Sequence, residues 1–436
     1  MANENVTLKT MTLAQISGMN LNIPEYQRDY CWDQKNVIQL LQDIENAHGA
    51  TYRLGSLILC ETQPDHFDIV DGQQRLITLT LVLNAIDSKN TGNLLNLNFT
   101  SEMARQYIAY NYKLIRDYLE SHDFIKRVSD LARTIEFSVL KINCIAENGA
   151  GELAWKNMDL AFTFFSNTNS RGVRLSDFDL LKAHHLRYLP IAGQQVHMAQ
   201  RWNAMVLDAD SKHPSWDRDN RDYIRTLEIY IYCLRKWLRK RPVNEWEAYR
   251  VKNEYESAAI IDEIPPFGEA FQYKEPIQGG SHFFAYTEHF VNRFKNFTTT
   301  EEYKAIHQLR CESHVWFRDV IEANLFAYYL KFGEQYLTEA LLLIARLISE
   351  IRYREQRVYR EKLLNSNIGS LELSIAIDQA TSPTFFLAEI LSRIKHLPKT
   401  ESHIGIRARY KARIEDCLRP LLGRITTTQI LPYIRF

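Results

Sequence analysis

The chain has 436 residues, of which 45% are hydrophobic and 12% aromatic, which is enough apolar material for two or three packed domains. Lysine plus arginine and aspartate plus glutamate each number 53, so the formal net charge is zero. This balance excludes a global basic field that would draw the protein to nucleic acid, and any contact with DNA must come from a local patch.

The six cysteines lie far apart and form no CxxC pair, so their spacing favours neither a zinc site nor a disulfide framework. The first residues lack the apolar core of a signal peptide. The most apolar helix candidate, at 336–351, is charged and too short to cross a bilayer. We therefore expect a soluble protein of a reducing compartment, most simply the cytoplasm, with no membrane partner.

The N-terminal part of the chain has a mixed α/β pattern. Apolar residues recur at helical spacing after Asp33, a good N-cap, and predict a helix there. Apolar runs at 52–61 and 67–70 predict two buried strands, and Gly55 interrupts the first of them. The five residues DGQQR, at 71–75, then stand between the second strand and an apolar helix.

Further along, the pattern becomes helical, with one more strand predicted at 137–146. Polar residues at 169–172 predict a turn. Ser176 and Asp179 have capping-box spacing, so we expect a helix to begin there. The C-terminal half consists of predicted long helices with an irregular break at 263–282.

These patterns predict an α+β protein, with a small mixed α/β N-terminal domain and a mostly helical remainder. The predicted divisions are an α/β core over 1–95, a helical completion of that domain over 96–194, and a helical C-terminal domain over 195–436, which would recognise DNA or a partner.

A strand, a glycine turn and a helix start can together hold an anion, because the first helical turn leaves backbone N–H groups unpaired. Gly72 would let the backbone approach a phosphate, and Arg75 could bind that phosphate with two hydrogen bonds. Asp71 could bind magnesium through water or act as a base, while Gln73 and Gln74 could orient a water or read a base. The alternative is a plain tight turn in which Arg75 pairs with Asp71 and the amides face solvent.

Two further stretches place polar side chains beside helix ends. The segment IPEYQRDYCW, at 23–32, carries aromatic rings next to an arginine, a combination that can stack on a base, although its Trp32 is better interpreted as core. The segment NTNSRGVRLSDFDLLKAHH, at 167–185, places asparagines and an arginine at a helix junction. Its alternative interpretation is a capped corner whose apolar residues pack inward.

Four ordered motifs resemble the N-terminal domain family of GmrSD-type restriction endonucleases. They read IPEYQRDYCW, YRLGSLIL, DIVDGQQRLITL and NSRGVRLSDFDLLK, and the similarity covers about residues 10–190. The central motif departs from the family pattern only at Ile77, where threonine is usual, and Thr78 remains.

The resemblance implies a fold like that of ParB and sulfiredoxin, and a module that binds and hydrolyses a nucleoside triphosphate with magnesium in defence against phage or modified DNA. Within it, Asp71, Gln74 and Arg75 would be catalytic. The nucleotide would be bound by residues of three segments, namely Tyr26, Gln27, Arg28, Gly72, Gln73, Thr78, Asn169, Arg171 and Lys182.

Many members of that family carry a C-terminal His-Asn-His nuclease domain, but this chain has no DHIxP-like string, no P-loop and no clustered metal ligands. Two alternatives therefore stay open. One is a non-catalytic subunit that binds DNA or a partner and recruits or regulates a separate nuclease. The other is a DNA endonuclease whose metal ligands are dispersed.

Three helical segments are locally basic, at 235–241, 352–362 and 406–424. The interleaved tyrosines Tyr353, Tyr359 and Tyr410 would suit a nucleic-acid groove. Acidic residues are mixed in, however, which is the pattern of a solvated helix face.

Overall fold

The structure is a computed structural model, and it describes residues 6–86, 102–122, 131–145, 160, 176–189, 192–210, 222–243, 251–256, 272–309, 315–355, 357–366, 371–397 and 404–434. The chain divides into two compact units, Met1–Ala199 and Gln200–Phe436, which are described separately. Unit 1 has a mixed sheet with helices and unit 2 is helical, so the predicted α+β class is confirmed.

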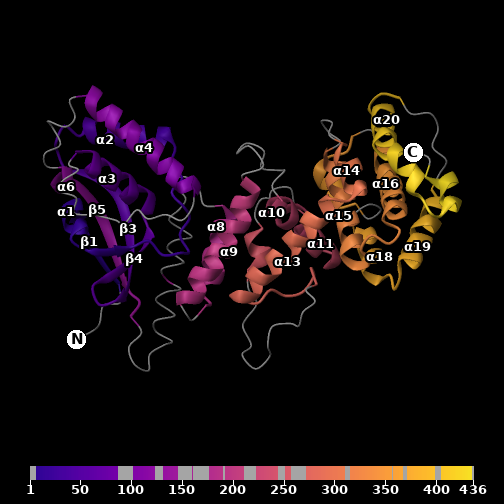
Figure 1. Cartoon of the computed structure of the whole chain (residues 1–436), viewed down its shortest axis with the longest axis horizontal. Helices are drawn as coiled ribbons and strands as arrows, with labels where there is room; N and C mark the ends of the chain where they lie inside the picture. Colours follow the sequence, from indigo (N-terminus) through magenta and orange to yellow (C-terminus); the bar gives the residue numbers. More distant parts are fainter. Residues whose placement is uncertain are drawn as a thin grey trace. The chain divides into compact units, whose positions relative to one another are not determined.

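Unit 1 is built around a five-stranded sheet (Figure 1). Its strands are β1 (Val6–Thr12), β2 (Asn20–Asn22), β3 (Tyr52–Gln63), β4 (His66–Asp71) and β5 (Ile135–Asn143). Its helices are α1 (Leu13–Ser17), α2 (Gln34–Asn46), α3 (Gln73–Ile86), α4 (Glu102–Ser121), α6 (Leu131–Thr134), α8 (Asp177–Leu186) and α9 (Ala192–Asp210), the last of which continues into unit 2.

The strand order is β1-β5-β3-β4-β2, with β5 parallel to β3, β2 parallel to β4, and the other neighbours antiparallel. The three predicted strands are confirmed as β3, β4 and β5. Strands β1 and β2 were not predicted, because β1 is an edge strand with an exposed centre and β2 has three residues. The predicted N-caps Asp33 and Ser176 are confirmed, and each forms a capping box.

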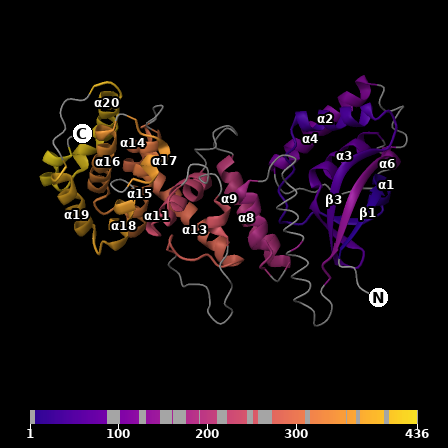
Figure 2. The same cartoon turned by 180° about the vertical axis from the view of Figure 1, so that it is seen from behind.

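Apolar side chains cover both faces of the sheet, which explains why its inner strands are continuous apolar runs. Leu57 and Leu59 face one core, which includes residues of α2, α3 and α4. These helices lie on one side of the sheet in both views (Figures 1 and 2). Ile58 and Cys60 face a second, smaller core, where Ala183 of α8 packs.

Cys60 and Cys144 form a disulfide in this second core. This pairing corrects the sequence analysis, which expected no disulfide. The two cysteines are 84 residues apart, and only the parallel pairing of β3 with β5 brings them together. The spacing of the cysteines along the chain therefore carried no signal of the bond.

The elements of unit 2 that the structure describes are all helices. Its elements are α10 (Asp222–Ile224), the π-helix η3 (Arg225–Ile231), α11 (Tyr232–Leu238), α12 (Lys252–Tyr255), α13 (Ser281–Thr298), α14 (Glu301–His307), α15 (Val315–Phe332), α16 (Leu337–Arg354), α17 (Arg360–Leu364), α18 (Glu372–Gln379), α19 (Pro383–Lys395), α20 (Ile406–Leu418) and the 3-10 helices η6 (Arg419–Arg424) and η7 (Thr428–Tyr433). The break predicted at 263–282 lies partly outside the described residues.

Helix α16 is buried along nearly its whole length, and two of its acidic residues are held by partners inside the protein. Glu339 accepts hydrogen bonds from the backbone and hydroxyl of Thr426, and Glu350 pairs with Arg346. None of the helices that the structure describes is both long enough and apolar enough to span a bilayer.

A buried ion network joins η3 to α15. The Arg225 guanidinium pairs with Glu322 and with Asp319, and the Tyr230 hydroxyl also donates to Glu322. His307 reaches the other oxygen of Glu322 at 2.8 Å. Burial alone would raise the pKa of Glu322, but Arg225 and His307 lower it to about 2.

The disulfide gives a first prediction. Closing a loop of 84 residues stabilises the folded state by about 4 kcal/mol in the chain-entropy view. We expect a reducing agent to lower the thermal midpoint of the wild type. The Cys60→Ala/Cys144→Ala double variant should show no further change on reduction, whereas a Cys233→Ala variant should respond as the wild type does. An equal response of the double variant would contradict the pairing.

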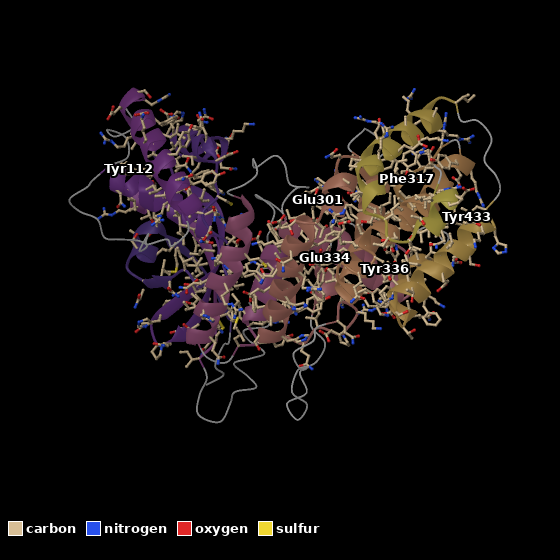
Figure 3. The ribbon with its side chains drawn as sticks, turned by 45° about the vertical axis from the view of Figure 1, so that its right-hand side comes forward. Tyr112, Glu301, Phe317, Glu334, Tyr336 and Tyr433 are labelled. Carbon is tan, nitrogen blue, oxygen red and sulfur yellow. A yellow bond between two sulfur atoms is a disulfide. The ribbon has the colours of Figure 1, made fainter. Side chains whose placement is uncertain are left out.

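The ion network gives a second prediction. Because the pKa of Glu322 falls from its usual 4.5 to about 2 on folding, its charge stabilises the protein above pH 4.5 and less as the pH falls toward 2. Glu322→Gln should lower the free energy of unfolding, measured with urea, by about 3 kcal/mol at neutral pH. The same variant should show a smaller change in that free energy between pH 4.5 and pH 2. Glu301→Gln, at an exposed ion pair (Figure 3), should change little. A wild-type acid profile in Glu322→Gln would contradict this assignment.

Candidate functional site

The DGQQR stretch forms the corner between β4 and α3. Strand β4 ends at Asp71, Gly72 has φ +98°, and α3 begins at Gln73. A Cβ at Gly72 would lie 2.8 Å from Leu57 Cδ1, so a side chain is excluded both by conformation and by space. The Gly72 N–H bonds to the Asp71 carboxylate, which thus sits at the start of the helix.

Arg75 ties this corner to the neighbouring strand. Its Nη2 donates to Asp71 Oδ2 at 3.2 Å, and its Nη1 donates to the Leu54 carbonyl at 3.0 Å. Next to Leu54, Gly55 has φ +107°, and a Cβ there would lie 2.7 Å from Arg75 Nη1. The glycine that interrupts β3 therefore makes room for the guanidinium. The Arg75 and Asp71 side chains keep 21% and 15% of their surface exposed, so solvent reaches the pair.

The two glutamines of the stretch bind backbone. Gln73 Nε2 donates to the Arg28 carbonyl at 3.1 Å, and Gln74 Nε2 donates to the Asp29 carbonyl at 3.1 Å. Gln74 Oε1 also accepts from the Cys31 N–H at 2.9 Å. Both side chains are buried. The alternative interpretation of this stretch is right about the Asp71–Arg75 pair and wrong about the amides, which do not face solvent.

Further hydrogen bonds join the same segments. Gln27 Nε2 donates to the carbonyls of Ile69 and Val70 at 2.9 and 2.8 Å, and Lys182 Nζ donates to the Gln27 carbonyl at 3.2 Å. Thr78 is buried and bonds through its hydroxyl to the Gln74 carbonyl. The segment at 23–32, the DGQQR corner and helix α8 are therefore one hydrogen-bonded unit.

Asn111 is a member of this unit that the sequence analysis missed. It lies on α4, where its Nδ2 donates to the Tyr30 hydroxyl at 3.1 Å and to the Trp32 carbonyl at 2.8 Å. The Tyr30 hydroxyl also bonds Thr78 at 2.9 Å. A lone asparagine among the apolar positions of a helix was the only signal in the sequence.

Charges at the corner are arranged around Asp71. The pKa of the Asp71 carboxyl is raised by burial, and Arg75, the Gly72 N–H and Arg28 offset that rise only in part. Arg28 and Arg75 therefore both act on one carboxylate. Burial lowers the pKa of Lys182, which is 4% exposed, and nearby Asp29 and Asp179 oppose that shift.

The remaining predicted residues lie in different surroundings. Tyr26 is partly buried and packs against the second core, where burial and then Asp68 raise the pKa of its hydroxyl. Asn169 and Arg171 lie outside the described residues, as does the turn predicted at 169–172. Among the residues that the structure describes, no group of three or more metal-ligating side chains is preassembled.

The basic stretches of unit 2 are largely solvated, as their mixed charges predicted, and Tyr359 and Arg409 are exposed, but a few of their residues are buried. Arg235 is buried and donates to Glu254 at 2.7 Å and to the Tyr273 carbonyl at 2.9 Å, so its role is structural. Tyr353 and Tyr410 are buried, which corrects the expectation that they could stack on bases.

The glutamine contacts give a third prediction. Gln74→Leu leaves the Asp29 carbonyl and the Cys31 N–H without their partner and should cost about 3 kcal/mol in urea unfolding. Gln73→Leu loses one hydrogen bond and should cost about 1 kcal/mol. The control, Gln39→Leu, removes an exposed amide and should stay near the wild type. Unchanged stability in Gln74→Leu would show that this amide does not hold the backbone.

Comparison with known protein families agrees with the motif resemblance. Residues 9–186 match the family described as GmrSD restriction endonuclease, N-terminal domain. Residues 194–405 match a family of unknown function, DUF7834. No curated protein matches the chain significantly. The resemblance found in the sequence is thus confirmed: residues 9–186 match the GmrSD-type N-terminal domain, and the match that follows is to a DUF7834 region and not to a known nuclease domain.

Proposed function

We propose that this chain is a component of a restriction or anti-phage defence system acting on DNA, and that its N-terminal domain binds and hydrolyses a nucleoside triphosphate at the DGQQR corner. The family match supports the first part, because the matched domain is that of a restriction endonuclease. One observation carries the second part: Arg28 and Arg75 both act on the Asp71 carboxylate at the start of α3.

In this proposal Asp71 occupies the position of an anion. Two guanidinium groups and a helix N-terminus favour a negative charge there, and the protein supplies one itself. A triphosphate would bring stronger acceptors to the same donors and displace Asp71 from Arg75. The released carboxylate could then accept a proton from the attacking water.

The buried amides act on this chemistry by positioning. Gln27, Gln73 and Gln74 fix the backbone that carries Arg28, and Lys182 holds the same segment from α8. Fixing these charges before the ligand arrives lowers the reorganisation needed during reaction. Magnesium would be held by the phosphate oxygens of the nucleotide and would neutralise their charge.

The fourth prediction separates binding from hydrolysis. Arg28→Met should weaken triphosphate binding by about tenfold or more, because one phosphate contact is lost. Asp71→Asn should bind as tightly as the wild type or more tightly, because the competing carboxylate is gone. The same variant should hydrolyse about 100-fold or more slowly, because the base is gone. Calorimetric binding and phosphate release, each with magnesium, measure the two effects.

The control for these variants is Arg53→Met on β3, whose exposed guanidinium pairs with Glu136. It should bind and hydrolyse as the wild type does. Binding without phosphate release in the wild type would instead identify a sensor that regulates a separate nuclease. Metal-dependent plasmid cleavage that persists in Arg28→Met and Asp71→Asn would identify a separate nuclease site. Triphosphate affinity unchanged in Arg28→Met would contradict the proposed site.

A further inference from the structure

Arg352 lies near the C-terminal end of α16 and is buried. The residue is 2% exposed, and neither its Nε nor its Nη2 has a hydrogen-bond partner. Within the described part of the chain, no carboxylate forms an ion pair with it. Glu350, the nearest acid on the same helix, instead pairs with Arg346 at 3.2 Å and with Arg354 at 2.8 Å.

The contact that Arg352 does make is with an aromatic ring. Its guanidinium lies 4.8 Å from the centroid of the Phe317 ring. Phe317 lies near the start of α15 (Figure 3). A cation–π contact returns less free energy than the removal of a guanidinium from water costs. Burial lowers the pKa of Arg352 and nearby Arg407 lowers it further, with Tyr410 opposing them, as expected for a cation that lacks a counter-ion.

A helix N-terminus lies at the same place. Helix α20 has 13 residues, and its N-cap Gly405 has φ +63° and provides no side-chain hydrogen bond to the first turn. Arg407, on that first turn, has its Nη2 3.5 Å from the Arg354 carbonyl, which links the start of α20 to the end of α16. The two helices lie side by side in both views (Figures 1 and 2).

Two contacts of Tyr410 fix the position of α20. The Tyr410 hydroxyl bonds the Ser349 hydroxyl of α16 at 2.9 Å, and the Tyr410 ring packs 5.0 Å from that of Phe317. The packed rings of Phe317 and Tyr410 therefore hold Arg352, Arg407 and the first turn of α20 close together. All three carry positive or partly positive charge.

We propose that Arg352, Arg407 and the first turn of α20 form a binding site for a phosphate group, supplied by the backbone of a DNA duplex or by a free phosphate. Guanidinium groups and helix N-termini are the protein groups best suited to phosphate oxygens. Because Tyr353 and Tyr410 are buried, neither ring can stack on a base at this site. Bound DNA would thus be held by its backbone, with little dependence on sequence.

The fifth prediction concerns DNA binding by the full chain. The probe is a short fluorescein-labelled duplex titrated at several salt concentrations. Arg352→Met and Arg407→Gln should each weaken binding about tenfold and lower the slope of log affinity against log salt by about one. Arg409→Gln removes an exposed arginine from the other side of α20 and should keep the affinity and slope of the wild type.

A second measurement uses the thermal midpoint. Arg352→Met should raise the midpoint of the free protein, because it replaces an unpaired buried charge with an apolar side chain. An arginine retained only for packing would lower the midpoint when replaced. The melting transition also shows whether the Arg352→Met variant is folded. Arg407 is less buried than Arg352, so Arg407→Gln tests the same site at a less buried position.

Inorganic phosphate at constant ionic strength distinguishes the two sources. Stabilisation by phosphate that is lost in Arg352→Met, with DNA binding unchanged, would identify free phosphate as the ligand. An Arg28→Met background keeps phosphate binding at the DGQQR corner out of this comparison. If Arg352→Met and Arg407→Gln bind both the duplex and phosphate as the wild type does, the proposed site is wrong.

Discussion

Hydrogen bonds from buried glutamine amides to backbone carbonyls hold the N-terminal domain together at its charged corner. Gln73 and Gln74 reach residues 45 positions earlier in the chain, and Gln27 reaches 42 and 43 positions later. A primary amide both donates and accepts, so it can pair with a main chain as a neighbouring strand would. Glutamate lacks the donor and leucine lacks both groups, and either would leave backbone groups unpaired.

This scaffold decides where charge lies. The backbone that receives the Gln73 and Gln74 amides carries Arg28 and Asp29, so those side chains are fixed close to Asp71 and Lys182 respectively. Each buried cation then has an acid within electrostatic reach, which limits the cost of burial. In the sequence, every polar group of the DGQQR motif could face a ligand. In the folded protein its two glutamine amides bind backbone instead, and only Asp71 and Arg75 keep access to solvent.

Local patterns predicted the elements but not the contacts between them. The strands β3, β4 and β5 and the N-caps at Asp33 and Ser176 follow from apolar periodicity and capping chemistry, which act over a few residues. The Asp71–Arg75 pair follows from helical i, i+4 spacing. The direction of the Gln74 amide and the Cys60–Cys144 bond depend on which distant segments become neighbours, and no local pattern contains that information.

Unit 2 offers two buried arginines with opposite surroundings. Arg225, at the start of the π-helix, faces Glu322 and Asp319 and is fully compensated by acids and a tyrosine hydroxyl. Arg352 is equally buried, yet no carboxylate among the described residues forms an ion pair with it, and its guanidinium lies over the Phe317 ring. Stability alone accounts for Arg225, because removing any member of its network leaves a buried charge. It does not account for Arg352, whose burial costs free energy that an anion from outside the fold would recover.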